Sequence, residues 1–301
     1  MAPERVLLVG DVKRIEAGLV EQGGNPGFEL CHASQVVEMH ESPTAALRNK
    51  RDSSIAICVQ NVRDGHAGAL VSMGNTGALV AAATRGLGTL PGVKRPGIAV
   101  TLALHGRPMT ILDMGANIAP KPEHLVQYGL MGSVYAKTCL DCESPRIGLL
   151  NIGEESTKGT ALLKEAHSLM TASTAGFVGN IEGNEIFSGD ADVVVTDGFT
   201  GNVVLKLMEG LSGLMFGLVL GELKSHGVEW GAEALGNIRK HIDYAQYGGA
   251  LLLGVAGAVV VGHGRSDEIA VANALALAAR DLDAGVNAEI VRGVAGEEAS
   301  A

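Results

Sequence analysis

Short apolar runs alternate with segments of helical spacing along most of the chain. Val193–Val195 is a β-branched run of the kind that a buried strand requires, and the residues after Gly198 and Gly201 have the spacing of an amphipathic helix. The same pattern predicts further strands at 5–10, 29–32, 67–71, 97–104, 109–113, 147–150 and 258–261, with helices between most of them. Alternating strands and helices indicate an α/β protein in three layers, an α/β/α sandwich in which both faces of the sheet are covered.

Four loops that follow predicted strands are rich in glycine and small polar side chains. They comprise residues 72–77, 113–117, 151–159 and 197–202. The carboxyl ends of the strands in an open parallel sheet face one crevice, so we expect the four loops to converge there. Backbone N–H groups at the N-terminus of a helix favour an anion, and phosphate is the anion expected. A simple turn with a capping residue explains any one of these loops equally well, so their convergence is what favours a phosphate site.

Residues 203–244 break the alternating pattern and are predicted to form a helical hairpin arm within a single domain of residues 1–301. Residues 203–223 are apolar and dotted with glycine, Ser225–Gly227 interrupts them, and residues 230–244 resume helical spacing. The apolar residues exceed what one helix face requires, so we expect part of the arm to be buried against a partner or a lipid surface. Burial in an ordinary core is the alternative. The glycine interruptions favour association with a membrane surface over a membrane span.

Composition narrows the possible functions. The chain has 301 residues, of which 47% are hydrophobic, so it can bury a large core. A net charge of -10 and an aromatic content of 3% argue against general nucleic-acid binding. The amino terminus lacks the pattern of a signal peptide, so we expect a cytoplasmic protein. Cys139 and Cys142 have CxxC spacing, yet no second pair or histidine accompanies them. We therefore expect reduced thiols, with no metal and no cofactor.

A succession of long motifs resembles a known protein family. The motifs are SMGNTGAL, RPGIAVTL, DMGANIAPKPEHLVQYGLMGSVY, PRIGLLNIGEESTKG, GNIEG, DVVVTDGFTGNVVLKLMEG, YGGALLLG and HGRSD. From about Leu7 to the last helix, the chain resembles the bacterial phosphate acyltransferases of the PlsX family. The resemblance implies an enzyme that converts fatty acyl-acyl carrier protein and inorganic phosphate to acyl phosphate and free carrier protein. The product would feed a glycerol-3-phosphate acyltransferase in phospholipid synthesis. The resemblance also implies a fold similar to that of isocitrate and isopropylmalate dehydrogenases, a homodimer, and peripheral contact with the membrane.

The first part of the family pattern has no counterpart here. Family members begin with an additional strand, a loop of the form Asp-Ala-Met-Gly-Gly-Asp and a helix, whereas Val6–Gly10 resembles their second strand. Loss of an interior strand leaves backbone groups of its neighbours unpaired. We therefore expect either that translation starts upstream of Met1, or that the sheet has an open slot and the protein has little activity.

The resemblance and the loop chemistry together suggest site residues. Phosphate is mostly dianionic near neutral pH, so it can attack a thioester with little help from a base, and the site must position it and stabilise the oxyanion. The candidates for catalysis are Lys158, Lys206 and Asn202, although either lysine could be an ordinary solvated helix residue. The candidates for binding phosphate and substrate are Asn75, Thr76, Gly77, Asp113, Asn117, Glu154, Asp197, Thr200 and Gly201. The loops contain no cysteine, which favours direct attack over an acyl-enzyme. His105 and His263, both in predicted turns, are possible general acids.

A carrier protein, which is acidic, needs a local basic patch on a chain whose net charge is -10. The candidates for this patch are Arg48, Lys50, Arg51, Lys94 and Arg95. A solvated helix end is the alternative for the first three. Two other functions stay open at this point. One is a catalytically silent scaffold that binds carrier protein or membrane, and the other is a metal- and nicotinamide-dependent dehydrogenase of the same fold, which would need a cluster of aspartates.

Overall fold

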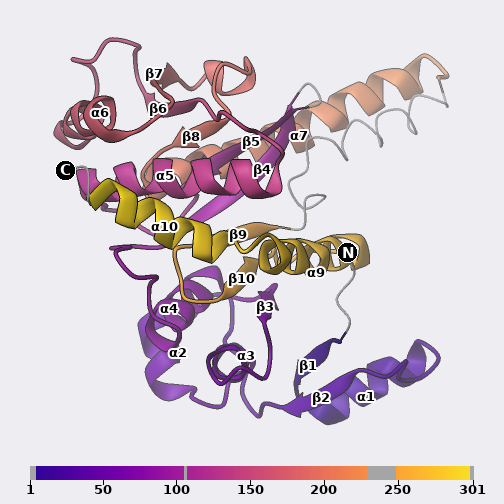
Figure 1. Cartoon of the computed structure of the whole chain (residues 1–301). Coiled ribbons are helices and arrows are strands. Elements are labelled where there is room, and N and C mark those ends of the chain that lie inside the picture. The colour runs from indigo at the N-terminus through magenta and orange to yellow at the C-terminus, as the bar shows by residue number, and fades with distance from the viewer. Residues whose placement is uncertain (1–4, 105–106, 229–248, 299–301) are drawn as a thin grey trace.

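A mixed sheet forms the middle layer of the protein (Figure 1). The computed structural model describes residues 5–104, 107–228 and 249–298. Within them the eight-stranded sheet has the order β3 (Ala69–Ser72), β10 (Ala258–Val261), β9 (Ala250–Leu253), β4 (Gly97–Leu104), β5 (Arg107–Leu112), β8 (Val193–Val195), β6 (Ile147–Asn151) and β7 (Phe177–Glu182). His105 lies outside the described residues, as do residues 229–248.

Helices cover both faces of this sheet, which confirms the predicted layers. One face carries α2 (Pro43–Asn49), α3 (Ser54–Arg63), α4 (Thr76–Gly86) and the short η1 (Glu185–Phe187). The other face carries α5 (Pro122–Cys139), α6 (Ala161–Ser173), α9 (Glu268–Ala284) and α10 (Val286–Glu298). The strands alternate between the two cores, because Val194 of β8 joins the first hydrophobic cluster while Val193 and Val195 join the second. All three valines are fully buried, as the β-branched run predicted.

Strand direction differs from the open parallel sheet on which the convergence of all four loops depends. The pairs β3–β10, β5–β8, β8–β6 and β6–β7 are parallel, whereas β10–β9, β9–β4 and β4–β5 are antiparallel. Consequently β3 runs opposite to β5, β8 and β6. The loop after β3 therefore leaves the sheet at the edge opposite to the loops after β5, β8 and β6.

The first two strands stand apart from the main sheet. β1 (Leu7–Gly10) and β2 (Glu29–His32), connected through α1 (Val12–Glu21), form a separate two-stranded parallel sheet. Among the described strands, β1 pairs only with β2 and β3 pairs only with β10, so each has one unpaired side. A cavity of about 270 Å³ is bordered by Val9 of β1, by Val71 and Ser72 of β3, and by side chains of α3.

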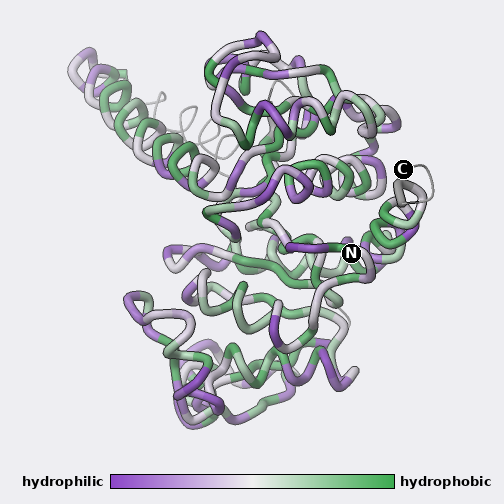
Figure 2. Tube along the Cα trace, turned by 90° about the vertical axis from the view of Figure 1, so that its left-hand side faces the viewer, coloured by the Kyte–Doolittle hydropathy of each residue, from purple (hydrophilic) through white to green (hydrophobic). Residues whose placement is uncertain are grey.

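One helix projects away from the layers in both views (Figures 1 and 2). It is α7 (Gly198–Ser225), 28 residues long, and it begins five residues before the predicted arm. The second half of that arm lies outside the described residues. Only the first turns of α7 contact the core, through Val204, Leu205 and Met208. From its first turn onward the helix exposes a series of large apolar side chains, namely Phe199, Val203, Leu207, Leu211, Leu214, Met215, Leu218 and Val219. By length and composition alone, α7 could cross a membrane.

Candidate active site

The start of α7 lies directly on the loop that follows β5. The Gly198 N–H donates to the Asn117 carbonyl at 2.8 Å. A Cβ on Gly198 would lie 2.6 Å from that carbonyl oxygen, and a Cβ on Gly201 would overlap the carbonyl oxygen of Asp113. Glycine is therefore required at both positions by close approach of two backbones. The structure thus brings together two of the predicted loops, 113–117 and 197–202.

Asp113 organises its own loop. Its carboxylate is fully buried and accepts the N–H groups of Ile98, Gly115, Ala116 and Asn117 at distances between 2.7 and 3.0 Å. Burial raises the pKa of Asp113, while the four N–H groups favour the ionised form. The Asn117 amide group donates to Tyr128 Oη at 2.7 Å and to the Pro96 carbonyl at 2.5 Å. The backbone N–H groups of Gly115, Ala116 and Asn117 are consequently used within the loop.

The backbone amides that begin α7 are also occupied. Asp197 Oδ1 accepts the N–H groups of Phe199 at 3.0 Å and Thr200 at 2.9 Å, and the Thr200 hydroxyl donates to Asp197 Oδ2 at 2.6 Å. The prediction that this turn offers its N–H groups to an anion was wrong. The physical reason is that an aspartate at the N-cap already supplies the negative charge that the helix end favours.

Two side chains on α7 stay available beside the Asp113 loop. Asn202 is exposed, and a Cβ on Gly115 would lie 3.6 Å from its Cβ and 3.7 Å from its Oδ1. No described residue hydrogen-bonds the Asn202 carboxamide. Lys206 follows four residues later, on the same face of the helix. Its ammonium is 2.8 Å from the Glu209 carboxylate, and the side chain is 53% exposed.

The loop after β6 leaves the same sheet edge. Leu149 of β6 pairs with Val195 of β8, so the ends of these two strands are neighbours. Within the loop, Lys158 Nζ lies 4.0 Å from the Glu155 carboxylate, and the lysine side chain is 49% exposed. Glu154 is exposed too, and its carbonyl accepts a hydrogen bond from Asn180. Three predicted loops thus share one edge, with Lys158 one strand away from the Asn202–Lys206 face.

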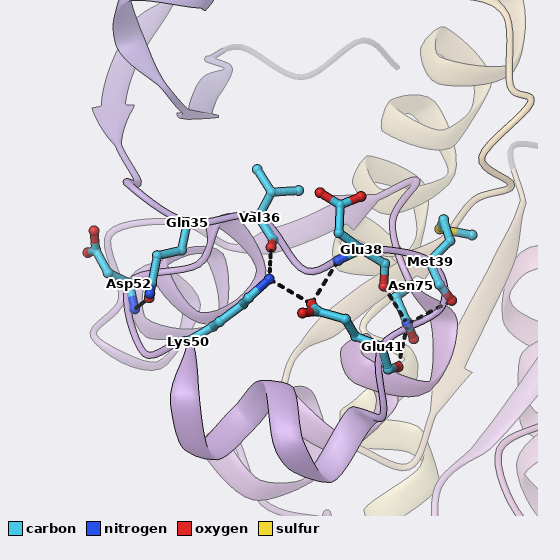
Figure 3. Close-up of polar contacts among 8 residues, drawn as sticks. All are labelled: Gln35, Val36, Glu38, Met39, Glu41, Lys50, Asp52 and Asn75. Atoms are coloured by element: carbon cyan, nitrogen blue, oxygen red, sulfur yellow. Dashed lines mark hydrogen bonds and ion pairs between the residues drawn. The ribbon is translucent and has the colours of Figure 1, made fainter.

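Asn75, Thr76 and Gly77 lie elsewhere, at the start of α4. The Asn75 carboxamide is almost fully buried: its oxygen accepts the Ala78 N–H at 2.9 Å, and its nitrogen donates to the carbonyls of Glu38, Met39 and Glu41 at 3.0 to 3.2 Å (Figure 3). The expectation that four loops meet at one edge is therefore corrected to three. Its premise was a parallel sheet, and the antiparallel pairs of β9 and β4 reverse the strand direction between β3 and β5.

The basic residues expected to dock a carrier protein occupy two places. Lys50 donates to the Val36 carbonyl at 2.6 Å and contacts the Glu41 carboxylate at 2.7 Å, so its ammonium holds the chain around α2 together (Figure 3). The hydrogen bond from Lys50 to the Glu41 carboxylate lowers the pKa of Glu41. Arg48 precedes Lys50 in the last turn of α2, and Arg51 follows it directly.

Lys94 and Arg95 precede β4 and lie near the N-terminus of α5. Burial, then the charge of Arg95, lowers the pKa of His124, and Lys94 and Lys121 act in the same direction. Lys94, Arg95 and Lys121 therefore form a basic group close to Asn117, whose side chain bonds the Pro96 carbonyl. Lys121 was absent from the sequence-based candidates, although it stands in the KPEHL part of a quoted motif.

Among the described residues, no group of three or more His, Cys, Asp or Glu side chains could hold a metal ion. Burial raises the pKa of both Cys139 and Cys142. A raised pKa keeps a thiol protonated and weakly nucleophilic.

Comparison with known proteins shows the family of the chain. The model of a family described as "Fatty acid synthesis protein" matches residues 2–289. A phosphate acyltransferase of Nitratidesulfovibrio vulgaris (strain Hildenborough) is 43% identical over 301 residues, covering 98% of this chain and 87% of its own. One from Myxococcus xanthus is 45% identical over 296 residues, covering 95% of this chain and 84% of its own.

A solved structure shows the same fold. A phosphotransacetylase from Streptococcus pyogenes is 16% identical and superposes with a TM-score of 0.63, covering 91% of this chain and 85% of its own. The sequence relatives carry the functional assignment, because the structural likeness at such low identity shows the fold alone. The chain belongs to the PlsX family of phosphate acyltransferases and is an enzyme that transfers acyl groups to phosphate.

Proposed function

We propose that the protein transfers the fatty acyl group of acyl-acyl carrier protein to inorganic phosphate. A phosphate oxygen attacks the thioester carbonyl carbon, the new C–O bond forms, the C–S bond breaks, and the carrier thiolate leaves and takes up a proton from solvent. The structural observation that supports this assignment is the exposed Asn202 beside Gly115, with Lys206 one turn further along α7, at the edge that also carries Lys158.

The residues at this edge have distinct roles in the proposed reaction. Phosphate, whose second pKa is about 6 by analogy with phosphoesters, is already nucleophilic at neutral pH, so holding it near the carbonyl is the main task. Lys206 and Lys158 supply positive charge for the dianion. The Asn202 amide group is a neutral donor for the oxyanion that forms on the acyl carbonyl. The two loops that support these side chains are held in place by the contacts described above, which involve Asp113, Asn117, Asp197, Thr200 and Gly201.

Acyl phosphate formation from acyl-acyl carrier protein and phosphate tests this function. We expect Lys206→Ala, Lys158→Ala and Asn202→Ala each to lower kcat/KM by roughly a hundredfold to a thousandfold, the range for losing one transition-state donor. Lys224→Ala, in the last turn of the same helix, is the matched control and should retain wild-type turnover. Wild-type turnover in the Lys206→Ala and Asn202→Ala variants would contradict the assignment. A silent scaffold would form no acyl phosphate, and a dehydrogenase of isocitrate dehydrogenase-like fold would require nicotinamide.

The partners follow from this chemistry as further proposals. The acidic carrier protein docks on Lys94 and Arg95, extended by Lys121, because this basic group lies beside the Asp113–Asn117 loop. Acyl phosphate is a reactive anhydride that a glycerol-3-phosphate acyltransferase would consume, at the entry to phospholipid synthesis. The enzyme would work in the cytoplasm at the membrane surface.

The exposed face of α7 supports a homodimer and peripheral membrane contact. Its apolar side chains recur every three or four residues from Phe199 to Leu218, which places them along one side of the helix. A continuous apolar stripe of this length on a surface is typical of an interaction site. We propose that the base of α7 contacts a second copy and that its far end contacts lipid.

A further inference from the structure

Asn180 is a buried polar side chain in β7 that has no part in the reaction proposed above. It belongs to the GNIEG motif and is 6% exposed. Its amide nitrogen donates to the carbonyl of Glu155 at 2.9 Å and to that of Glu154 at 3.4 Å. Both partners are acceptors, so the nitrogen must face them and the orientation of the carboxamide is fixed. The carboxamide oxygen is buried and has no hydrogen-bond partner within the described part of the chain.

The carbonyl that Asn180 holds is part of the turn that presents Lys158. The Lys158 N–H donates to the same Glu155 carbonyl at 3.0 Å. From the neighbouring strand, Asn151 donates to the Lys158 carbonyl at 3.3 Å and accepts the Ile152 N–H at 2.9 Å. Two carboxamides, one on β6 and one on β7, therefore fix the two ends of this turn.

The stem of Lys158 is held in a similar way. A Cβ on Gly153 would lie 3.0 Å from Lys158 Cγ, so the aliphatic stem lies across the glycine. The lysine backbone and the first part of its side chain are thus ordered, while the ammonium stays half exposed. An unpaired buried oxygen is unfavourable for folding alone, which indicates that Asn180 is retained for what its nitrogen does.

We propose that Asn180 is a positioning residue that acts on acyl transfer through Lys158. The inference rests on the proposed role of Lys158 in binding phosphate. Without the carboxamide nitrogen, the Glu154 and Glu155 carbonyls lose their hydrogen bonds to β7, and the Glu155 carbonyl keeps only the Lys158 N–H. The turn then relaxes, and the Lys158 ammonium spends less time where phosphate binds. The effect falls on kcat/KM for phosphate, because the charge itself is still present.

A double-mutant cycle tests the inference. Asn180→Leu removes the donor at similar side-chain size, and we expect kcat/KM for phosphate to fall by about tenfold to a hundredfold, as for a modest displacement of a reacting group. In a Lys158→Ala background, followed at enzyme concentrations that give measurable residual turnover, the same change should cost less than about twofold. Asn61→Leu is the matched control, because Asn61 donates to the Ile57 carbonyl at 2.8 Å within α3. It should leave kcat/KM for phosphate unchanged in both backgrounds.

A second variant keeps the test decisive if Asn180→Leu does not fold. Gly153→Ala places a methyl group against the Lys158 stem without touching Asn180, and it should reproduce the loss in the wild-type background and not in Lys158→Ala. Equal losses in both backgrounds would overturn the inference and leave the proposed function intact. A fully active Lys158→Ala variant would overturn the proposed role of Lys158 together with this inference.

Discussion

Gly201 of α7 rests directly on the backbone of Asp113. A Cβ at position 201 would overlap the Asp113 carbonyl oxygen and lie 3.0 Å from its carbonyl carbon. This contact sets the distance between the helix that carries Asn202 and Lys206 and the loop built around the Asp113 carboxylate. It is also a contact that a single methyl group would destroy.

Gly201→Ala is therefore expected to separate the helix from the loop. Inserting a methyl group into a closed backbone contact typically costs about 1–3 kcal/mol, and the shift of α7 should also lower turnover strongly. Urea denaturation and acyl phosphate formation measure the two effects. Gly213→Ala, at an open position of the same helix, should instead stabilise the helix by up to about 1 kcal/mol and leave turnover unchanged. Equal behaviour of the two variants would show that the close contact is unimportant.

The buried carboxyl of Asp281 should make the stability of the protein depend on pH. Burial raises the pKa of this α9 carboxyl to about 6 from 3.8, and its Oδ1 has no hydrogen-bond partner in the described structure. A raised pKa in the folded state favours the protonated form, so the stabilisation is complete below 3.8 and is lost as the pH rises through about 6. The shift corresponds to roughly 3 kcal/mol.

Asp281→Asn should consequently stabilise the protein at pH 8 and flatten the rise in stability between pH 8 and pH 5. Urea denaturation across this range measures the effect. The exposed Asp283, two residues away, provides the control variant Asp283→Asn, which should keep the wild-type pH dependence. A wild-type protein whose stability is constant over that range would contradict the assignment to Asp281.

Arg146 and Asp192 join the starts of β6 and β8. The guanidinium donates to both carboxylate oxygens, at 3.0 and 2.9 Å, and to the Gly189 carbonyl at 2.6 Å. Burial acts against ionisation, but the hydrogen bonds from Arg146 outweigh it and lower the pKa of Asp192. Stability from this pair is present above the unfolded pKa of Asp and is lost as the pH falls through the depressed value.

Arg146→Ala is expected to lower the free energy of unfolding by about 1–3 kcal/mol at pH 7, as for other charge-assisted hydrogen bonds. The difference from wild type should shrink in strongly acidic urea titrations. Arg63→Ala provides the comparison, because the Arg63–Asp64 pair is largely solvent-exposed and should contribute less than about 1 kcal/mol. A loss that persists unchanged at low pH would show that Arg146 stabilises the protein by packing instead.

The apolar stripe of α7 predicts binding to vesicles. Leu214→Asp together with Leu218→Asp removes two of its most exposed side chains and should abolish co-sedimentation with anionic vesicles while acyl transfer in solution persists. Ser225→Asp adds one negative charge at the end of the same helix without removing apolar surface, and it should bind vesicles nearly as well as wild type. Equal pelleting of the leucine variant would count against lipid contact.

The sequence alone determined the local elements and the family. Val193–Val195 was predicted as a buried strand and is one, and Ser42-Pro43 marks the start of α2, because β-branched runs and a proline in the first helical turn act through nearest neighbours. Strands β7 and β9 were not predicted. Gly179 and Asn180 interrupt the apolar pattern of the first, and the second is an apolar run of four residues directly after a glycine-rich loop. Their strand character comes from pairing with distant segments.

Tertiary structure decided the direction of the strands and the availability of donors. The position of Asn75 depends on the antiparallel pairs around β9 and β4, which no local pattern records. The amides after Asp113 and Asp197 looked free in the sequence but are bound by those carboxylates, and Lys50 faces inward to Val36, fourteen residues away. Sequence spacing shows that a hydrogen-bond donor lies near a loop. Long-range packing decides whether that donor is already hydrogen-bonded to a neighbouring acceptor.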